Sequence, residues 1–163
     1  EEREEIVYSD HVNLGVAVAA PQGLVVPVIH NAEGLSFVEL VEQVNNKIAR
    51  ALNNKLTRAD FLDLTFTFNR VAFYSERHKR MIGGESPNSI IPYTPCNARS
   101  DRPTGMIISL GLMQQVSDRW SMEAAYRFDH RLVDGRTPLE FMEDLRDFIQ
   151  ESSEEDFASV LTR

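Results

Sequence analysis

The feature that most constrains the fold is an uncharged run over residues 12–29, VNLGVAVAAPQGLVVPVI. Its length raises the question of a membrane-spanning helix, but its prolines, glycines and amides argue against one. The run is rich in β-branched residues and divides at the turn sequence APQG, so it predicts two buried strands, 12–19 and 24–29. Pro27 cannot donate to a strand ladder, which predicts that the second strand lies at a sheet edge or carries a bulge.

Two capping boxes mark the helices that follow this run. Ser36 and Glu39 predict the start of a long helix, because each side chain can bond the backbone N–H of the other residue. Its apolar face recurs at helical spacing: Phe37, Leu40, Val41, Val44, Ile48 and Ala51. Thr57 and Asp60 predict a second, short helix around residues 58–62.

The second half of the chain predicts three more strands and a closing helix. The strands are expected at residues 64–68, 106–113 and 120–128, and a long loop over 69–105, with a short strand at 89–92, separates the first two. Thr137 is the predicted cap of the last helix, with Pro138 at its first position and Glu140 completing a capping box. A buried stripe is expected at Leu139, Met142, Leu145 and Ile149. The order β-β-α-β-loop-β-β-α indicates an α/β domain with a mixed sheet and flanking helices, not a doubly wound sheet.

Charge and composition exclude several classes of function. The net charge is −8, which disfavours binding to nucleic acid or to anionic membranes. The first residues are acidic, so no signal peptide is expected and a cytoplasmic protein is predicted, or a mitochondrial matrix protein in a eukaryote. Cys96 is the single cysteine and is expected to be an incidental thiol, and no histidine has a partner at metal-ligand spacing, so no metal is predicted.

The candidate catalytic residues lie in the stretch DHRLVDG, residues 129–135, between a predicted strand and the last helix. Such a connection can project side chains into a cleft. His130 is the side chain best suited to proton transfer near neutral pH. Asp134, four residues later, can fix the loop by pairing with Arg131 or another arginine.

Several motifs occur in the order found in one enzyme family. The run at residues 12–29 is followed by a capped helix, then by KLT with Asp60, then by TFTF at residues 65–68, and finally by DHRLVDG. This sequence resembles the acyltransferase component of 2-oxoacid dehydrogenase complexes over about residues 12–150. The resemblance assigns residues 1–150 to the C-terminal part of the catalytic domain and leaves 151–163 as an acidic tail.

The resemblance implies a chloramphenicol-acetyltransferase-like fold, incomplete at its N-terminus, that forms a homotrimer or larger core with sites between subunits. It implies coenzyme-A-dependent acyl transfer from a lipoyl group, which is carried on a separate domain that works with other subunits of the complex. His130 would be the general base for the thiol of coenzyme A, and Asp134 would hold the site together. The coenzyme-A-binding residues are not predicted.

Departures from the family pattern leave alternatives open. Where the family has a serine or threonine that donates to the oxyanion, this chain has Asn69, whose amide can also donate. A catalytically impaired or inactive structural or assembly core of the same fold is one alternative, and an acetyltransferase acting on a small alcohol is another. The basic residues between Arg70 and Arg102 can either attract the phosphates of coenzyme A or form a solvated surface.

Overall fold

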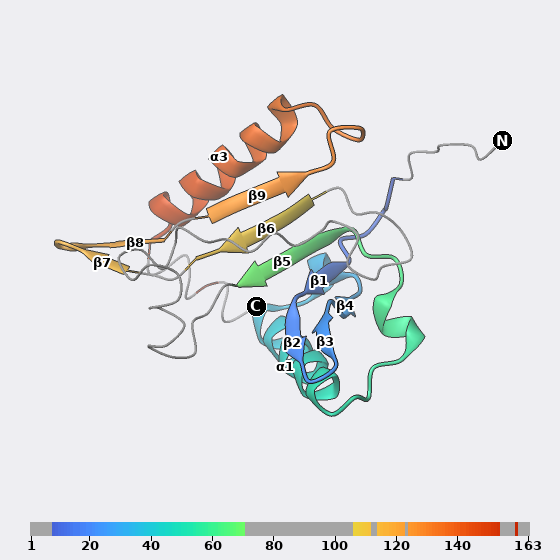
Figure 1. Ribbon diagram of the computed structural model, residues 1–163. Coiled ribbons are helices and arrows are strands. Elements are labelled where there is room, and N and C mark those ends of the chain that lie inside the picture. Colours follow the sequence, from blue (N-terminus) through green and yellow to red (C-terminus); the bar gives the residue numbers. More distant parts are fainter. Residues whose placement is uncertain (1–7, 71–105, 112–113, 123, 154–158, 160–163) are drawn as a thin grey trace.

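A mixed five-stranded sheet forms the centre of the computed structural model, which describes residues 8–70, 106–111, 114–122, 124–153 and 159 (Figure 1). The strand order is β4-β1-β5-β6-β9. Their bounds are Val28–Ile29, Leu14–Val16, Phe66–Arg70, Met106–Leu110 and Ala124–Phe128, respectively. The central pairs β1–β5 and β5–β6 are parallel, and the outer pairs β1–β4 and β6–β9 are antiparallel. The prediction of a mixed sheet with flanking helices is confirmed.

The uncharged run forms four short strands instead of the two that were predicted. Between β1 and β4, the strands β2 (Val18–Ala20) and β3 (Gly23–Val25) form a hairpin of their own. Pro27 lies just before β4, which is an edge strand, and its carbonyl accepts from Val16 N–H at 3.0 Å. The expected edge position is therefore confirmed, and the proline explains why the second strand is divided.

Gly15 allows close packing beneath the sheet. A Cβ atom on this residue would lie 2.5 Å from Leu64 Cδ1 and 2.8 Å from Val26 Cγ1. Leu64, Val26 and Val28 form a buried cluster at this point. Because real Cβ atoms do not approach side chains so closely, a glycine is required here by space.

The helix α1 (Phe37–Leu52) begins as predicted, with the capping box of Ser36 and Glu39. The inner residues of its apolar face pack towards β2 and β3, where Ile48 and Ala51 join Val18 and Val25 in a hydrophobic cluster. At the N-terminal end of that face, Phe37 and Val41 remain 42% and 41% exposed. The predicted burial is thus correct towards the C-terminal end of α1 and wrong for these two residues at its start.

The second capping box forms a buried charge cluster. The short 3-10 helix η2 (Arg58–Phe61) follows Thr57, whose backbone N–H and hydroxyl donate to Asp60 Oδ2 at 2.7 and 2.9 Å. Asp60 is only 3% exposed, and its carboxylate also accepts from Lys47 Nζ at 2.7 Å and from both terminal nitrogens of Arg50. Burial raises the pKa of Asp60, but the bonds from Lys47 and Thr57 outweigh it and hold the pKa well below its usual range.

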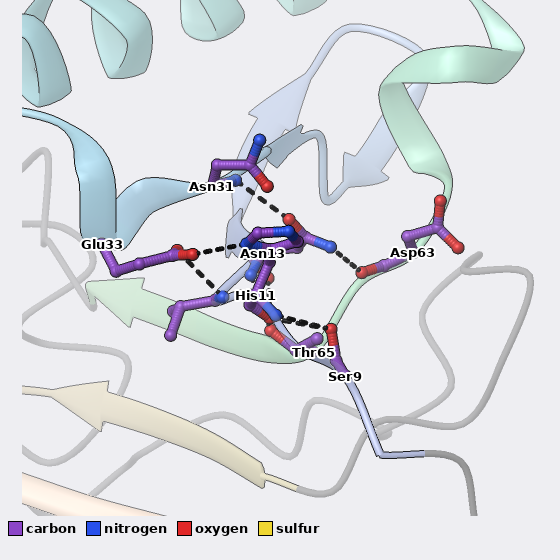
Figure 2. A network of polar contacts seen from close by, with 8 residues as sticks. Ser9, His11, Asn13, Asn31, Glu33, Asp63 and Thr65 are labelled. Carbon is purple, nitrogen blue, oxygen red and sulfur yellow. Dashed lines mark hydrogen bonds and ion pairs between the residues drawn. The ribbon is translucent and has the colours of Figure 1, made fainter.

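Asn13 connects three segments at the start of the sheet (Figure 2). Its side chain accepts from Asn31 N–H at 3.0 Å and donates to the Asp63 carbonyl at 2.8 Å. Both partners have a positive φ, of 52° and 55°, so each is held at a left-handed turn. The single-turn 3-10 helix η1 (Ala32–Gly34) follows, and its Glu33 carboxylate binds His11 Nδ1 at 2.8 Å and Val12 N–H at 3.0 Å.

The strands of the C-terminal half differ from prediction in several places. The strand expected at residues 64–68 is β5, Phe66–Arg70, so Asn69 lies in a strand and not at the start of the predicted loop. The expected strand 120–128 is divided into β8 (Arg119–Ser121) and β9, and β8 forms a hairpin with the unpredicted β7 (Gln114–Val116). Ser117 turns this hairpin with a φ of 58°, a local conformation that periodicity does not reveal. The predicted strand 106–113 is confirmed as far as Leu110.

The last helix, α3 (Arg136–Glu151), lies beside β9 at the margin of the sheet (Figure 1). Leu139 and Ile149 of its predicted buried stripe are 49% and 47% exposed, so the expectation of burial is wrong for these residues. Met142 and Leu145 are half-buried. The helical spacing was therefore read correctly, whereas the sequence could not show how little of the described chain packs against α3.

Some predictions fall on residues that the structure does not describe. They are the loop and strand between residues 71 and 105, Cys96, and the basic residues from Arg77 to Arg102. The division at residue 150 also stays a prediction. No helix within the described ranges has both the length and the apolar character needed to cross a bilayer.

Candidate active site

His130 lies in the connection between β9 and α3, directly after an aromatic stripe on β9. The ring of Phe128 lies 5.5 Å from the His130 ring, tilted by 45°, and the ring of Tyr126 stacks on Phe128 at 6.1 Å. The three residues alternate along the chain, so their side chains emerge on one side of the strand. His130 itself is exposed to solvent. The imidazole is thus supported on one side by a ring and open on the other.

Asp129 and Arg131, the residues on either side of His130, form an ion pair. The Arg131 guanidinium binds Asp129 with Nη2–Oδ2 and Nε–Oδ1 distances of 2.6 and 3.0 Å, and the Arg131 N–H also donates to Oδ1 at 3.0 Å. These bonds lower the pKa of Asp129 to about 2. The backbone on either side of His130 is therefore held in a tight turn, which restricts where the imidazole can point.

Asp134 fixes the start of α3. Its Oδ1 atom accepts from the backbone N–H of Arg136 at 3.0 Å and of Thr137 at 3.2 Å. The two N–H bonds, Thr137 first, lower the pKa of Asp134, and the nearby His130 adds a small Coulombic contribution in the same direction. The prediction that Thr137 caps this helix is wrong, because α3 begins at Arg136 and the carboxylate before it satisfies its first N–H groups. Asp134 was expected to pair with Arg131 or another arginine side chain, but its bonds go to backbone N–H groups, and the Arg131 guanidinium binds Asp129.

Gly135 lies next to the imidazole of His130. Its φ and ψ of −69° and −17° are helical, so no backbone strain requires a glycine. The nearest atom to an added Cβ would be His130 Nε2, at 4.0 Å. A side chain larger than alanine would therefore crowd His130 Nε2.

Asn69 lies near the carboxyl end of β5, opposite Ser109 of β6. Its Nδ2 atom donates to Ser109 Oγ at 3.3 Å. Asn69 is half-buried, and Ser109 is 5% exposed. Sequence reasoning identified Asn69 but missed Ser109, although a single serine inside the apolar strand MIISL is an unusual residue at such a position.

The sheet register separates His130 from Asn69 within one chain. Asn69 is in register with Ser109, and Ser109 with Ala125. β9 continues for three more residues to Phe128, about 10 Å along the strand, before the chain reaches His130. By this register the two residues lie towards opposite ends of the central strands.

His130 and Asp134 are brought together by the structure, and Asn69 is not. In a single copy the candidate residues therefore lie in two places: His130 and Asp134 beside the start of α3, and Asn69 towards the other end of the central strands. Among the described residues, no cluster of histidine, cysteine and carboxylate side chains is arranged to bind a metal ion.

Comparison with known proteins shows which family the chain resembles. Residues 1–79 match the family model of the 2-oxoacid dehydrogenases acyltransferase (catalytic domain). The mitochondrial dihydrolipoyllysine-residue succinyltransferase component of the 2-oxoglutarate dehydrogenase complex of Saccharomyces cerevisiae is 30% identical over 150 residues. This match covers 92% of the chain but only 30% of the yeast protein, so the chain spans less than a third of that relative's length.

Two solved structures share the fold. A truncated catalytic core of the 2-oxoacid dehydrogenase multienzyme complex from Thermoplasma acidophilum matches with a TM-score of 0.68 and 30% identity, over 92% of this chain and 62% of that one. The dihydrolipoamide acetyltransferase of Azotobacter vinelandii matches with a TM-score of 0.67 and 25% identity, over 95% and 58%. In the Azotobacter enzyme, catalytic roles have been investigated for a serine, a histidine and an asparagine four residues after that histidine.

Fold and sequence together define an acyltransferase catalytic domain, of which this chain covers a part. The chain belongs to the family of 2-oxoacid dehydrogenase acyltransferases. The predicted family and the chloramphenicol-acetyltransferase-like fold are thereby confirmed.

Proposed function

We propose that the chain transfers an acyl group between a lipoyl thioester and coenzyme A, with His130 as general base. The observation that carries this proposal is the placement of His130: an exposed imidazole, supported by Phe128 and held in a tight turn next to the capped start of α3. A histidine followed four residues later by a capping side chain also matches the pair investigated in the Azotobacter enzyme, with Asp134 in place of its asparagine.

The proposed reaction begins at the thiol of coenzyme A. A thiol is mostly protonated near pH 7, so the imidazole of His130 takes its proton and leaves the nucleophilic thiolate. The thiolate attacks the carbonyl carbon of the acyl-dihydrolipoyl thioester, and a tetrahedral oxyanion forms. When the carbon–sulfur bond to the dihydrolipoyl group breaks, His130 returns its proton to the departing sulfur, giving acyl-coenzyme A and free dihydrolipoyl.

Asn69 is the proposed donor to the oxyanion. Its carboxamide has two N–H hydrogens, of which Ser109 accepts one, so the other is available to a substrate oxygen. A positioned donor at such a place contributes about 10²-fold or more to the rate. In the family that the chain resembles, a serine or threonine at this position donates to the oxyanion, and Asn69 would replace it.

The complete site is proposed to lie between subunits of a trimer. The register places His130 and Asn69 towards opposite ends of the strands, so one chain cannot bring both to one thioester. A closed ring of copies can bring His130 of one copy to Asn69 of the next. The trimer, or a larger core built from it, would receive acyl groups from a separate lipoyl domain within a 2-oxoacid dehydrogenase complex, in the cytoplasm or the mitochondrial matrix.

Subunit mixing tests the proposal most directly. His130→Ala should lower acyl transfer from acyl-dihydrolipoamide to coenzyme A by about 10²- to 10⁴-fold. Asn69→Ala should lower it by about 10²-fold, and Asn69→Ser should retain activity. If the two inactive variants are unfolded and refolded together in equal amounts, random cyclic assembly should restore about a quarter of the wild-type sites.

Each alternative predicts a different result. A site within one chain would give no recovery on mixing, which would contradict the trimeric arrangement. A folded, trimeric wild type without turnover would identify the chain as a structural core. Acetyl transfer from acetyl-coenzyme A to chloramphenicol, without transfer to dihydrolipoamide, would identify an acetyltransferase that acts on an alcohol.

A further inference from the structure

Ser109 is a buried hydroxyl group in an apolar strand. Its neighbours on β6 are Ile107, Ile108 and Leu110, and only 5% of its surface is exposed. Burying a hydroxyl without a hydrogen bond is unfavourable by several kcal/mol in an apolar medium, so such groups normally have a partner. Here the Asn69 carboxamide supplies the bond, with Nδ2 lying 3.3 Å from Ser109 Oγ.

The geometry of the pair fixes the Asn69 amide in one orientation. The two residues are directly in register on neighbouring parallel strands, so their side chains emerge on the same face of the sheet. The amide group is planar, and one of its two N–H bonds points to Ser109. Fixing that bond also fixes the direction of the second N–H, which is the one proposed to bind the oxyanion.

We propose that Ser109 is a positioning residue for Asn69 in acyl transfer. This inference rests on the proposed function, in which Asn69 donates to the oxyanion. Without the serine hydroxyl, the carboxamide can rotate and present its oxygen to the site, and an oxygen repels the developing negative charge. Ser109 therefore acts on the transition state more than on substrate binding, and its removal should lower kcat and leave KM nearly unchanged.

The test uses Ser109→Ala in the full chain, with Thr67→Val as the matched control. Thr67 is another buried residue with a hydroxyl, 3% exposed, but it lies in register with Ile107. Ser109→Ala should lower kcat by about tenfold, and KM for coenzyme A and for acyl-dihydrolipoamide should change by less than about twofold. Thr67→Val should leave kcat within about twofold of wild type.

A double variant separates positioning from a general structural effect. In the Asn69→Ala background, Ser109→Ala should have little further effect on kcat, because no amide remains to be positioned. A wild-type kcat in Ser109→Ala would overturn the inference. An equal loss in the Asn69→Ala background, or an equal loss in Thr67→Val, would do so as well.

A measurement without turnover distinguishes this inference from the proposed function. The side-chain amide protons of Asn69, followed by NMR, should exchange with water more slowly in the wild type than in Ser109→Ala. Equal exchange rates would overturn the positioning role even in an active enzyme. If Asn69→Ala keeps full activity while Ser109→Ala still accelerates exchange, the pair exists and the oxyanion role of Asn69 is what fails.

Discussion

Asp134 Oδ1 lies 3.2 Å from the backbone nitrogen of Thr137 and accepts its hydrogen bond, so the aspartate of the DHRLVDG motif also binds the first turn of α3. The same oxygen accepts from Arg136 N–H at 3.0 Å. The start of the helix and the turn that holds His130 therefore depend on one carboxylate. A change at Asp134 should affect helix stability and acyl transfer together.

We expect Asp134→Ala to lower both the melting temperature, by a few degrees, and kcat. Asp134→Asn should be close to wild type in melting temperature, because its amide oxygen accepts the same two bonds. Asp144→Ala, which removes an exposed carboxylate from the body of α3, is the control and should melt like the wild type. Thermal unfolding followed by circular dichroism measures the melting temperatures. If Asp134→Ala and Asp134→Asn melt at the same temperature, the bonds accepted by Asp134 Oδ1 do not stabilise the start of α3.

Substitution of Asn13 should lower the free energy of unfolding more than substitution of an exposed asparagine. Asn13→Ala removes the acceptor for Asn31 N–H and the donor to the Asp63 carbonyl (Figure 2), and should lower the free energy of unfolding by about 2 kcal/mol. Asn13→Asp keeps the acceptor and loses the donor, so its carboxylate oxygen would face the carbonyl and it should also be destabilised. Urea unfolding measures both changes, with Asn46→Ala on the exposed part of α1 as the control. A loss no greater than that of the control would show that the two turns hold without this bridge.

Local signals in the sequence were reliable for two of the three predicted capping boxes. Ser36 with Glu39 and Thr57 with Asp60 form as predicted, because the members of each pair are only three positions apart. The third box, Thr137 with Glu140, does not form, because α3 begins at Arg136 and the Glu140 carboxylate binds Arg136 Nε. Strand boundaries were less predictable, because bonds between distant residues determine them. The bond from Val16 N–H to the Pro27 carbonyl is an example.

The candidate site shows the same limit. His130 and Asp134 were found because they share one short motif, but the sequence predicted Thr137 as the cap of the last helix and did not indicate that Asp134 binds the first turn. The pairing of Asn69 with Ser109 joins two strands that are forty positions apart in the chain. Only the register of β5 against β6 brings them together, and no periodicity within either strand contains that register.

Asp60 is a buried carboxylate that binds two basic side chains of α1, Lys47 and Arg50. Asp60→Ala would leave Lys47, which is 9% exposed, without its carboxylate, and we expect a loss of about 3 kcal/mol or more in the free energy of unfolding. Glu42→Ala, at an exposed position on the same helix, should change stability by less than about 0.5 kcal/mol. Urea denaturation of both variants measures the difference. Similar values for the two would mean that the buried ion pair contributes nothing net.

The Asp60 carboxylate should also make the free energy of unfolding depend on pH. The pKa of Asp60 is lower in the folded chain than the value of about 3.9 expected when it is unfolded. The unfolded state therefore binds more protons as the pH falls. The contribution of Asp60 is fully present above about pH 5 and is lost progressively as the pH falls towards the folded pKa.

Asp60→Asn cannot titrate, so its free energy of unfolding should fall less steeply than that of the wild type below about pH 5. The remaining slope in the variant would come from other carboxylates with lowered pKa values, such as Asp129 and Glu33. Urea unfolding at a series of pH values from neutral to acid gives both curves. Parallel curves for the two proteins would contradict the prediction, because they would mean that Asp60 binds its proton equally in both states.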